Sequence, residues 1–227
     1  METQFVSKKR VTDHGEVYTR KREVNAMLDL VRHETERIES RFLEPACGRG
    51  NFLAEILERK LAVVENRYRR SQVEYERNVV LAVSSIYGID ILEDNIIECR
   101  KRLFGIFDWA YSRLYNKKAK NKCRNAVMYI LERNIIWGDA LTLKTVGLSP
   151  EPIIFSEWSP VKGSLFKRRD FAFHELMPDE NQMKLPLFSA QEALLFSDQG
   201  EKAFIPSPVK KYPLTHFLRI ADVADQL

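Results

Sequence analysis

The sequence predicts an α/β protein built around a central, mostly parallel sheet. Two observations carry this expectation: short apolar segments alternate with longer stretches of helical periodicity, and a glycine turn follows the first segment. The apolar segments occupy residues 42–43, 86–89, 134–137 and 153–155. Parallel strands need long crossover connections, usually helices, and the spacing of these segments leaves room for them.

Helical periodicity appears before and between these segments, where apolar residues recur every three or four positions. Residues 23–38 carry one such face ahead of the first strand, and residues 52–64 and 92–106 follow the first two strands. A charged stretch at residues 66–76 is also expected to be helical, and residues 125–132 precede the third strand as a further helix.

The sequence pattern changes after Pro150, where the alternation of apolar segments and helical stretches ends. The fourth apolar segment is expected to pair with residues 166–173 as a hairpin, across a turn at Lys162-Gly163. Prolines then punctuate short segments, of which one, residues 190–196, has helical spacing. We therefore expect a main domain over residues 1–160 and a short C-terminal extension over residues 161–227.

Composition excludes several classes of protein. The 227 residues are 44% apolar and 30% charged, with 9 Gly and 9 Pro, which excludes a disordered or collagen-like chain. Cys47, Cys99 and Cys123 are far apart in the sequence, so neither a disulfide framework nor a metal site is expected. The net charge of +4 is a mild basic bias. With no signal segment and no apolar run of about 18 residues, a soluble, cytoplasmic protein without a membrane partner is expected.

The glycine turn is the first candidate binding element. Gly48-x-Gly50 between a strand and a helix lets the backbone approach a ligand and presents helix N-terminal N–H groups to an anion. A dinucleotide site would need a small residue at position 53, which is Leu53, and an acid about 20 residues later, where Arg69 and Arg70 stand. The sequence therefore disfavours a nicotinamide-dinucleotide site.

The residues around this turn are more specific. The decapeptide at residues 44–53 reads EPACGRGNFL and resembles motif I of the amino-DNA methyltransferases, usually written D/E-P-A-C-G-S-G-x-F-L. Residues 14–19 resemble motif X of that family, residues 88–91 resemble motif II, and residues 138–141 resemble motif III. Their order is that of the gamma group, whose members mostly methylate the N6 amine of adenine. The resemblance covers about residues 14–157 and implies a Rossmann-like, S-adenosylmethionine-dependent methyltransferase fold.

The resemblance also implies a cofactor site for S-adenosyl-L-methionine. In this family the glycine loop lies against the methionine moiety, and motif X residues, here Tyr18 and Thr19, close the pocket. Asp90 would accept both ribose hydroxyls, and Asp139 would accept the adenine amine. The residues expected to hold the cofactor are Tyr18, Thr19, Glu44, Ala46, Gly48, Gly50, Asp90, Ile91, Asp139 and Ala140.

Each of these features has a structural alternative. A glycine pair between a strand and a helix also serves as a tight turn without a ligand. Acids that follow strands are commonly helix N-caps or turn residues, which would account for Asp90 and Asp139. Cys47 is expected to be a small packed residue, and Trp137 a core residue.

The chain departs from the family at the catalytic motif, N/D/S-P-P-Y/F/W, because it contains no Pro-Pro. The expected place holds Ser156, Glu157 and Trp158. In the family this motif accepts both protons of the amine and stacks an aromatic ring on a flipped base. Ser156 or Glu157 is the candidate acceptor and Trp158 the stacking residue. The alternative is that Trp158 is structural and catalysis is absent.

Two basic clusters are candidates for contact with nucleic acid. One contains Lys117, Lys118, Lys120 and Lys122; the other contains Lys167, Arg168 and Arg169. In the second cluster Phe166 and Phe171 flank the cations, which suits a splayed nucleotide, whereas the alternative for both is a solvated face.

The expected function is therefore an S-adenosylmethionine-dependent DNA (adenine-N6) methyltransferase, or the modification subunit of a restriction–modification system. Fewer than about eighty residues follow Trp158, too few for a full target-recognition domain, so a separate specificity subunit is an expected partner alongside DNA. One alternative is a non-catalytic cofactor- or DNA-binding subunit that needs a partner chain. A weaker one is a methyltransferase fold that acts on RNA or protein.

Overall fold

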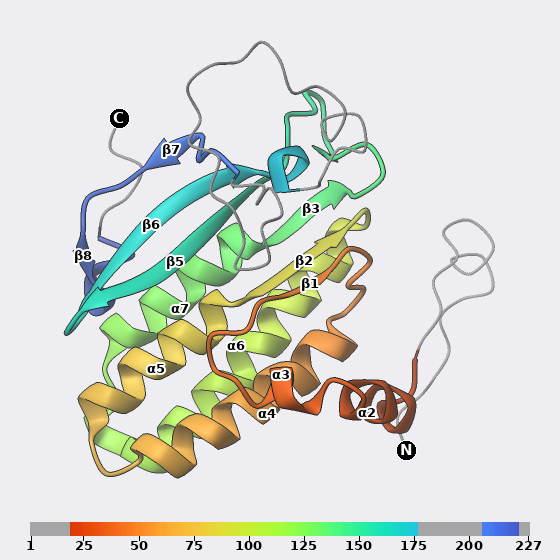
Figure 1. Cartoon of the computed structure of the whole chain (residues 1–227). Helices are drawn as coiled ribbons and strands as arrows, with labels where there is room; N and C mark the ends of the chain where they lie inside the picture. The colour runs from red at the N-terminus through yellow and green to blue at the C-terminus, as the bar shows by residue number, and fades with distance from the viewer. Residues whose placement is uncertain (1–18, 177–205, 223–227) are drawn as a thin grey trace, which may run out of the picture.

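The computed structural model describes residues 19–176 and 206–222, and these form an α/β structure with two sheets. The first sheet has four strands in the order β1-β2-β3-β4, and the second is antiparallel and is built on a long hairpin of β5 and β6. Helices α4 to α7 gather on one side of the first sheet (Figure 1). Their connections between consecutive parallel strands are the long crossovers that parallel pairing requires.

The first sheet combines parallel and antiparallel pairing. β1 (Phe42–Glu44), β2 (Ile86–Asp90) and β3 (Ile135–Asp139) run parallel, and β4 (Lys144–Thr145) pairs antiparallel with β3. All five residues of β2, the strand between β1 and β3, are buried, as expected for a strand that is covered on both faces.

The helices form a layer against this sheet, and their buried side chains join in one large apolar cluster. Within the cluster, Tyr111 stacks on Tyr75 with ring centroids 6.1 Å apart and on Phe107 at 5.5 Å. The helices are α2 (Lys21–Asp29), α3 (Arg32–Thr35), α4 (Asn51–Tyr68), α5 (Gln72–Ser84), α6 (Glu93–Tyr115) and α7 (Asn121–Asn134).

The antiparallel sheet begins where the chain leaves the first sheet. β5 and β6 pair along almost their whole length, and Gly163, with φ of 56°, lies in the turn between them. β7 and β8 both pair with β6. The bounds are β5 (Ile154–Lys162), β6 (Leu165–Ala172), β7 (Lys210–Lys211) and β8 (Thr215–His216).

The start of the hairpin covers the face of β2 that the helices leave open. Tyr87 and Ile89 on β2 belong to a second apolar cluster with Ile153, Phe155 and Phe173. The Phe155 ring meets the Tyr87 ring edge-on at 5.3 Å. Farther along β5, Trp158 belongs to the helix-side cluster, so the hairpin contacts both layers of the molecule.

The α/β class is confirmed, and so are the expected strands and the hairpin, but in place of one mostly parallel sheet the structure has a mixed sheet and an antiparallel one. The helix expected over residues 66–76 is wrong, because α4 ends at Tyr68 and α5 begins at Gln72, where the Ser71 side chain accepts the Glu74 N–H as an N-cap. The helical stretch at residues 23–38 is divided between α2 and α3.

The expected domain boundary at residue 160 falls inside β5, whose partner strand lies on the other side of that boundary. The expected helix at residues 190–196 lies outside the described residues. Among the described helices, none is both long enough and apolar enough to cross a membrane.

Lys60 is a buried cation at the base of the first sheet. Its Nζ is within hydrogen-bond distance of the Ile38 carbonyl, at 3.0 Å, of the Ser40 carbonyl, and of Ser85 Oγ, at 2.6 Å. These contacts tie the segment before β1 to the end of α5. Burial lowers the pKa of Lys60 from its ordinary value of 10.5 to about 7, because an ammonium group loses hydration there.

This shift predicts a pH-dependent stability. Between about pH 7 and pH 8.5 the unfolded chain holds the Lys60 proton and the folded chain has begun to release it, so the free energy of unfolding should rise with pH. For one fully titrating group the slope approaches about 1.4 kcal/mol per pH unit. Urea unfolding of the wild type and of Lys60→Met across this window should show a steeper rise for the wild type. Equal slopes would contradict the lowered pKa.

Candidate functional site

The carboxyl ends of the parallel strands bring three predicted residues to one edge of the sheet. Glu44 ends β1, Asp90 ends β2 and Asp139 ends β3, and these strands are neighbours that point the same way. In the register, Glu44 lies opposite Gly88. This edge of an open α/β sheet is where such folds bind ligands. We call it the carboxyl edge.

The glycine turn leads from this edge into α4. Gly48 and Gly50 have φ of 51° and 78°, a region that side-chain-bearing residues seldom adopt. A Cβ on Gly50 would lie 2.6 Å from Cys99 Sγ, so Gly50 is required for packing against α6. A Cβ on Gly48 would meet no atom within 4 Å. Gly48 therefore leaves open space beside the start of α4, where N–H groups and the positive end of the helix dipole favour an anion.

Asp90 holds this turn in place. Its Oδ2 accepts the Gly48 N–H at 2.8 Å, and its Oδ1 accepts the Leu92 N–H at 2.9 Å and the Asn95 side chain at 3.2 Å. The Cys47 N–H also donates to the Ile89 carbonyl, at 2.8 Å. The carboxylate thus joins the turn after β1 to the start of α6. With two lone pairs on each oxygen, Oδ2 retains capacity for one further donor.

The segment before α2 reaches the same place. The Asn51 side chain, at the start of α4, donates to the Thr19 carbonyl at 3.4 Å and accepts from Arg102 on α6 at 2.5 Å. The Thr19 backbone is therefore held beside the start of α4, and the pocket-closing role of this residue stays a prediction. Tyr18 lies outside the described residues. No signal in the sequence pointed to Arg102, whose contact with Asn51 joins residues 51 positions apart, or to Asn95, which contacts Asp90 from the first turn of α6.

The two remaining acids of the edge differ in environment. Burial raises the pKa of Glu44, which forms no ion pair with any described residue. Asp139 accepts the Leu141 N–H at 2.9 Å and the Thr142 hydroxyl at 3.0 Å. The Leu141 contact in particular lowers the pKa of Asp139. Asp139 thus serves a local turn, which was the structural alternative for it.

The other residues expected at the cofactor site also flank the edge. Ala46 and Ile91 are exposed, and the Ile91 carbonyl accepts the Trp137 indole N–H at 2.9 Å. Ala140 packs against the apolar cluster of Phe155 and its neighbours.

Two thiols lie beneath the turn. Cys47 and Cys99 are both buried and in their free form. A hydrogen bond with Cys99, together with burial, raises the pKa of the Cys47 thiol, which suits a packed residue and not a nucleophile. No group of three metal-ligating side chains occurs among the described residues.

The structure does not bring Ser156, Glu157 and Trp158 to the carboxyl edge. The three residues lie within β5 and not in a loop that follows a strand, which differs from the expected placement. The Tyr87 hydroxyl, near the start of β2, donates to the Ser156 carbonyl at 3.3 Å. Glu157 pairs with Arg41, which immediately precedes β1. The trio therefore lies beside the amino ends of the parallel strands, at the opposite end from Gly48 and Asp90.

Ser156 belongs to a buried polar network. Its hydroxyl donates to Asp170 Oδ1 at 2.8 Å, and Asp170 also accepts two hydrogen bonds from Arg168, at 2.9 and 2.8 Å. Arg168 donates to the Tyr129 hydroxyl at 2.8 Å. The two-point contact between guanidinium and carboxylate compensates both buried charges. Ser156 Oγ is thus occupied in holding β5 to β6.

Trp158 is 6% exposed and lies against α7, where its ring meets Tyr129 edge-on at 6.1 Å. The Arg168 guanidinium lies 5.3 Å from the Trp158 ring centroid. In this arrangement the indole is packed on both sides and presents no face to a base.

The two basic clusters differ from their expected form. Arg168 is 7% exposed, so its assignment to a nucleic-acid surface is corrected: alternation along β6 turns it toward the buried network. Phe166 and Phe171 are buried and offer no stacking face. In the other cluster Lys117, Lys118 and Lys122 are exposed, whereas Lys120 pairs with the buried Glu76 carboxylate at 2.8 Å.

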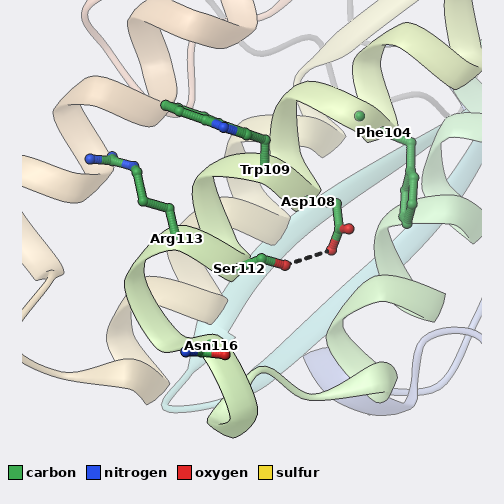
Figure 2. Close-up of a pocket in the computed structure, with 7 residues that line it drawn as sticks. Phe104, Asp108, Trp109, Ser112, Arg113 and Asn116 are labelled. Atoms are coloured by element: carbon green, nitrogen blue, oxygen red, sulfur yellow. Dashed lines mark hydrogen bonds between the residues drawn. The ribbon is translucent and has the colours of Figure 1, made fainter.

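Two open pockets lie away from the carboxyl edge, on α6. One, of about 670 Å³, is lined by Phe104, Asp108, Ser112 and Asn116 along one stripe of the helix (Figure 2). The second, of about 570 Å³, lies between α4 and α6. Both share Gly105, Trp109 and Arg113, and the Arg113 guanidinium lies 5.0 Å from the Trp109 ring centroid.

Comparison with known proteins gives no assignment. No family model, no curated protein and no solved structure matches the chain.

The buried position of Arg168 yields a stability prediction. Arg168→Met leaves the Asp170 charge without its partner inside the protein, and such a loss typically costs about 3–5 kcal/mol. The neighbouring substitution Lys167→Met, on the outer side of the strand, should cost less than about 0.5 kcal/mol. Guanidinium unfolding of both variants measures the difference. If both variants lost less than about 0.5 kcal/mol of unfolding free energy, the buried position of Arg168 would be contradicted.

Proposed function

We propose that this chain is the S-adenosylmethionine-binding subunit of a DNA (adenine-N6) modification system, with a Rossmann-like methyltransferase arrangement around the carboxyl edge. The observation that carries the proposal is the glycine turn at Gly48, which Asp90 holds open beside two further strand-end acids, Glu44 and Asp139. The resemblance of residues 44–53 to motif I supports the same cofactor.

The donor groups of the carboxyl edge fit the polar parts of this cofactor. The open space at Gly48, beside the N–H groups of α4, suits the carboxylate of the methionine moiety. Glu44 is a partly buried carboxylate whose raised pKa a cationic ammonium group would lower again. The free acceptor capacity of Asp90 Oδ2 suits one ribose hydroxyl. When bound, the cofactor supplies an electrophilic methyl group on a positively charged sulfur.

The subunit assignment follows from the position of the trio in β5. An exocyclic amine needs a proton acceptor and a stacking face next to the methyl donor. Ser156 and Glu157 are engaged in hydrogen bonds and ion pairs, and Trp158 is packed against α7. We therefore assign these three residues to the fold, and we propose that another chain presents the target base.

The first test of the proposal is binding of S-adenosylhomocysteine, measured by titration calorimetry. Glu44→Gln keeps the shape of the side chain and removes its charge, so affinity should fall by about 10-fold to 100-fold, the value of a charged hydrogen bond. The matched control is Glu132→Gln, an exposed acid on α7, which should bind like the wild type. Absence of heat with millimolar ligand, or equal affinity in both variants, would overturn the cofactor assignment.

The second test is transfer of a labelled methyl group to DNA that contains adenine. The isolated chain should bind S-adenosylhomocysteine yet transfer no label to single- or double-stranded DNA. Transfer by the isolated chain would contradict the subunit assignment. Its loss in Glu157→Gln, together with retained ligand binding and an unchanged melting temperature, would then give the β5 trio a catalytic role.

A further inference from the structure

One face of the antiparallel sheet, beyond the point where Phe155 packs on β2, carries an unbalanced group of cations. Directly paired residues on neighbouring strands share a face, and Arg169 is paired with Glu157 on one side and with Lys211 on the other. Lys167 lies two residues before Arg169 on the same face. Arg41 reaches this face from the segment before β1 and pairs with Glu157. We call Arg41, Lys167, Arg169 and Lys211 the basic face.

The charges on this face do not cancel. Glu157 is the one carboxylate that β5, β6 and β7 place there, since Asp170 is turned to the buried network. Glu157 is already shared by Arg41 and by Arg169, whose Nη2 lies 2.5 Å from it. Lys211 stands directly opposite Arg169, and like charges at paired positions destabilise a sheet. Four cations against one carboxylate leave a positive excess that an anion would relieve.

We propose that the basic face binds the phosphate backbone of a nucleic acid. Lys167 and Arg169 lie about 7 Å apart along β6, and Lys211 lies about 5 Å from Arg169 on β7, by standard sheet spacings. Arg41 extends the row at Glu157. Such a row suits a chain of phosphates, whereas one free phosphate needs donors that converge. The aromatic side chains of β5 and β6, Phe155, Trp158, Phe166 and Phe171, are all buried. Contact is therefore electrostatic and independent of base sequence.

The inference deepens the proposed function, because it names the surface that holds DNA, and it depends on that function only for the choice of DNA as probe. The basic face differs from the cluster predicted from the sequence, because it excludes Arg168 and includes Arg41 and Lys211. The basic face lies beside the amino ends of the parallel strands, so it does not overlap the carboxyl edge.

The test measures binding of a fluorescent DNA duplex to the full chain by anisotropy, between about 50 and about 200 mM salt. The double variant Lys167→Gln with Lys211→Gln removes two outward cations and leaves the ion pairs of Glu157 intact. For duplex DNA the slope of log K against log salt should become shallower by about 1.8, or about 0.9 for each lost contact. The matched control, Lys117→Gln with Lys122→Gln, removes the same charge from the other cluster and should leave the slope unchanged.

Each outcome bears on the proposal. A shallower slope in the first variant alone supports it, whereas an unchanged slope there, with or without a change in the control, overturns it. Equal changes in both variants would mean diffuse attraction to net charge and would also overturn it. Binding to phosphatidylserine vesicles without binding to DNA would replace nucleic acid by a membrane surface.

Binding of S-adenosylhomocysteine to the same double variant should equal that of the wild type. Failure of the DNA experiment is therefore separable from failure of the cofactor assignment. Equal melting temperatures of the two variants and the wild type establish that all three proteins are folded.

Discussion

The carboxyl edge depends on one buried carboxylate. Asp90 accepts the Gly48 and Leu92 N–H groups and the Asn95 amide, so it fixes the turn after β1 and the start of α6 at the same time. Without it, polar groups would remain unpaired in a protein interior, at about 1–3 kcal/mol each. Gly48 takes its left-handed conformation beside this carboxylate, next to the open space in front of α4.

Local signals in the sequence were sufficient to predict the three parallel strands of the first sheet, but not the short antiparallel strand β4. The strands at β1, β2 and β3 are short apolar runs, and the helices between them carry apolar residues at helical spacing, so both follow from local periodicity. The glycine turn could also be predicted, from Gly48-x-Gly50 between an apolar segment and a helical pattern. The structure adds that Gly50 packs so closely against Cys99 that only glycine fits. The break between α4 and α5 was missed because the charged residues around it continue a helical pattern, although Ser71 is a recognisable N-cap.

The site in β5 could not be predicted in the same way. Glu157 meets Arg41 across 116 positions of sequence, a contact that no local pattern encodes. The alternation of side chains along a strand could have predicted part of this arrangement. Consecutive residues of a strand point to opposite faces, so Ser156 and Trp158 cannot share a site with Glu157. The same two-residue alternation puts Arg168 on the opposite face of β6 from Lys167 and Arg169. Arg168 shares its face with Asp170, and both side chains are buried.

The position of β5 constrains how the two proposed surfaces could work together. The carboxyl edge and the basic face lie toward opposite ends of β2, and a five-residue strand spans about 17 Å. A methyl group is transferred only between atoms in contact, and about 17 Å corresponds to about five base pairs of a duplex. Under the proposal, the base at Gly48 is therefore a different nucleotide from those held on the basic face. A flipped base also needs its own stacking pocket, and the aromatic side chains of β5 and β6 are buried. Under the proposed function, docking of DNA and presentation of the target base are therefore tasks of different surfaces, as the subunit proposal requires.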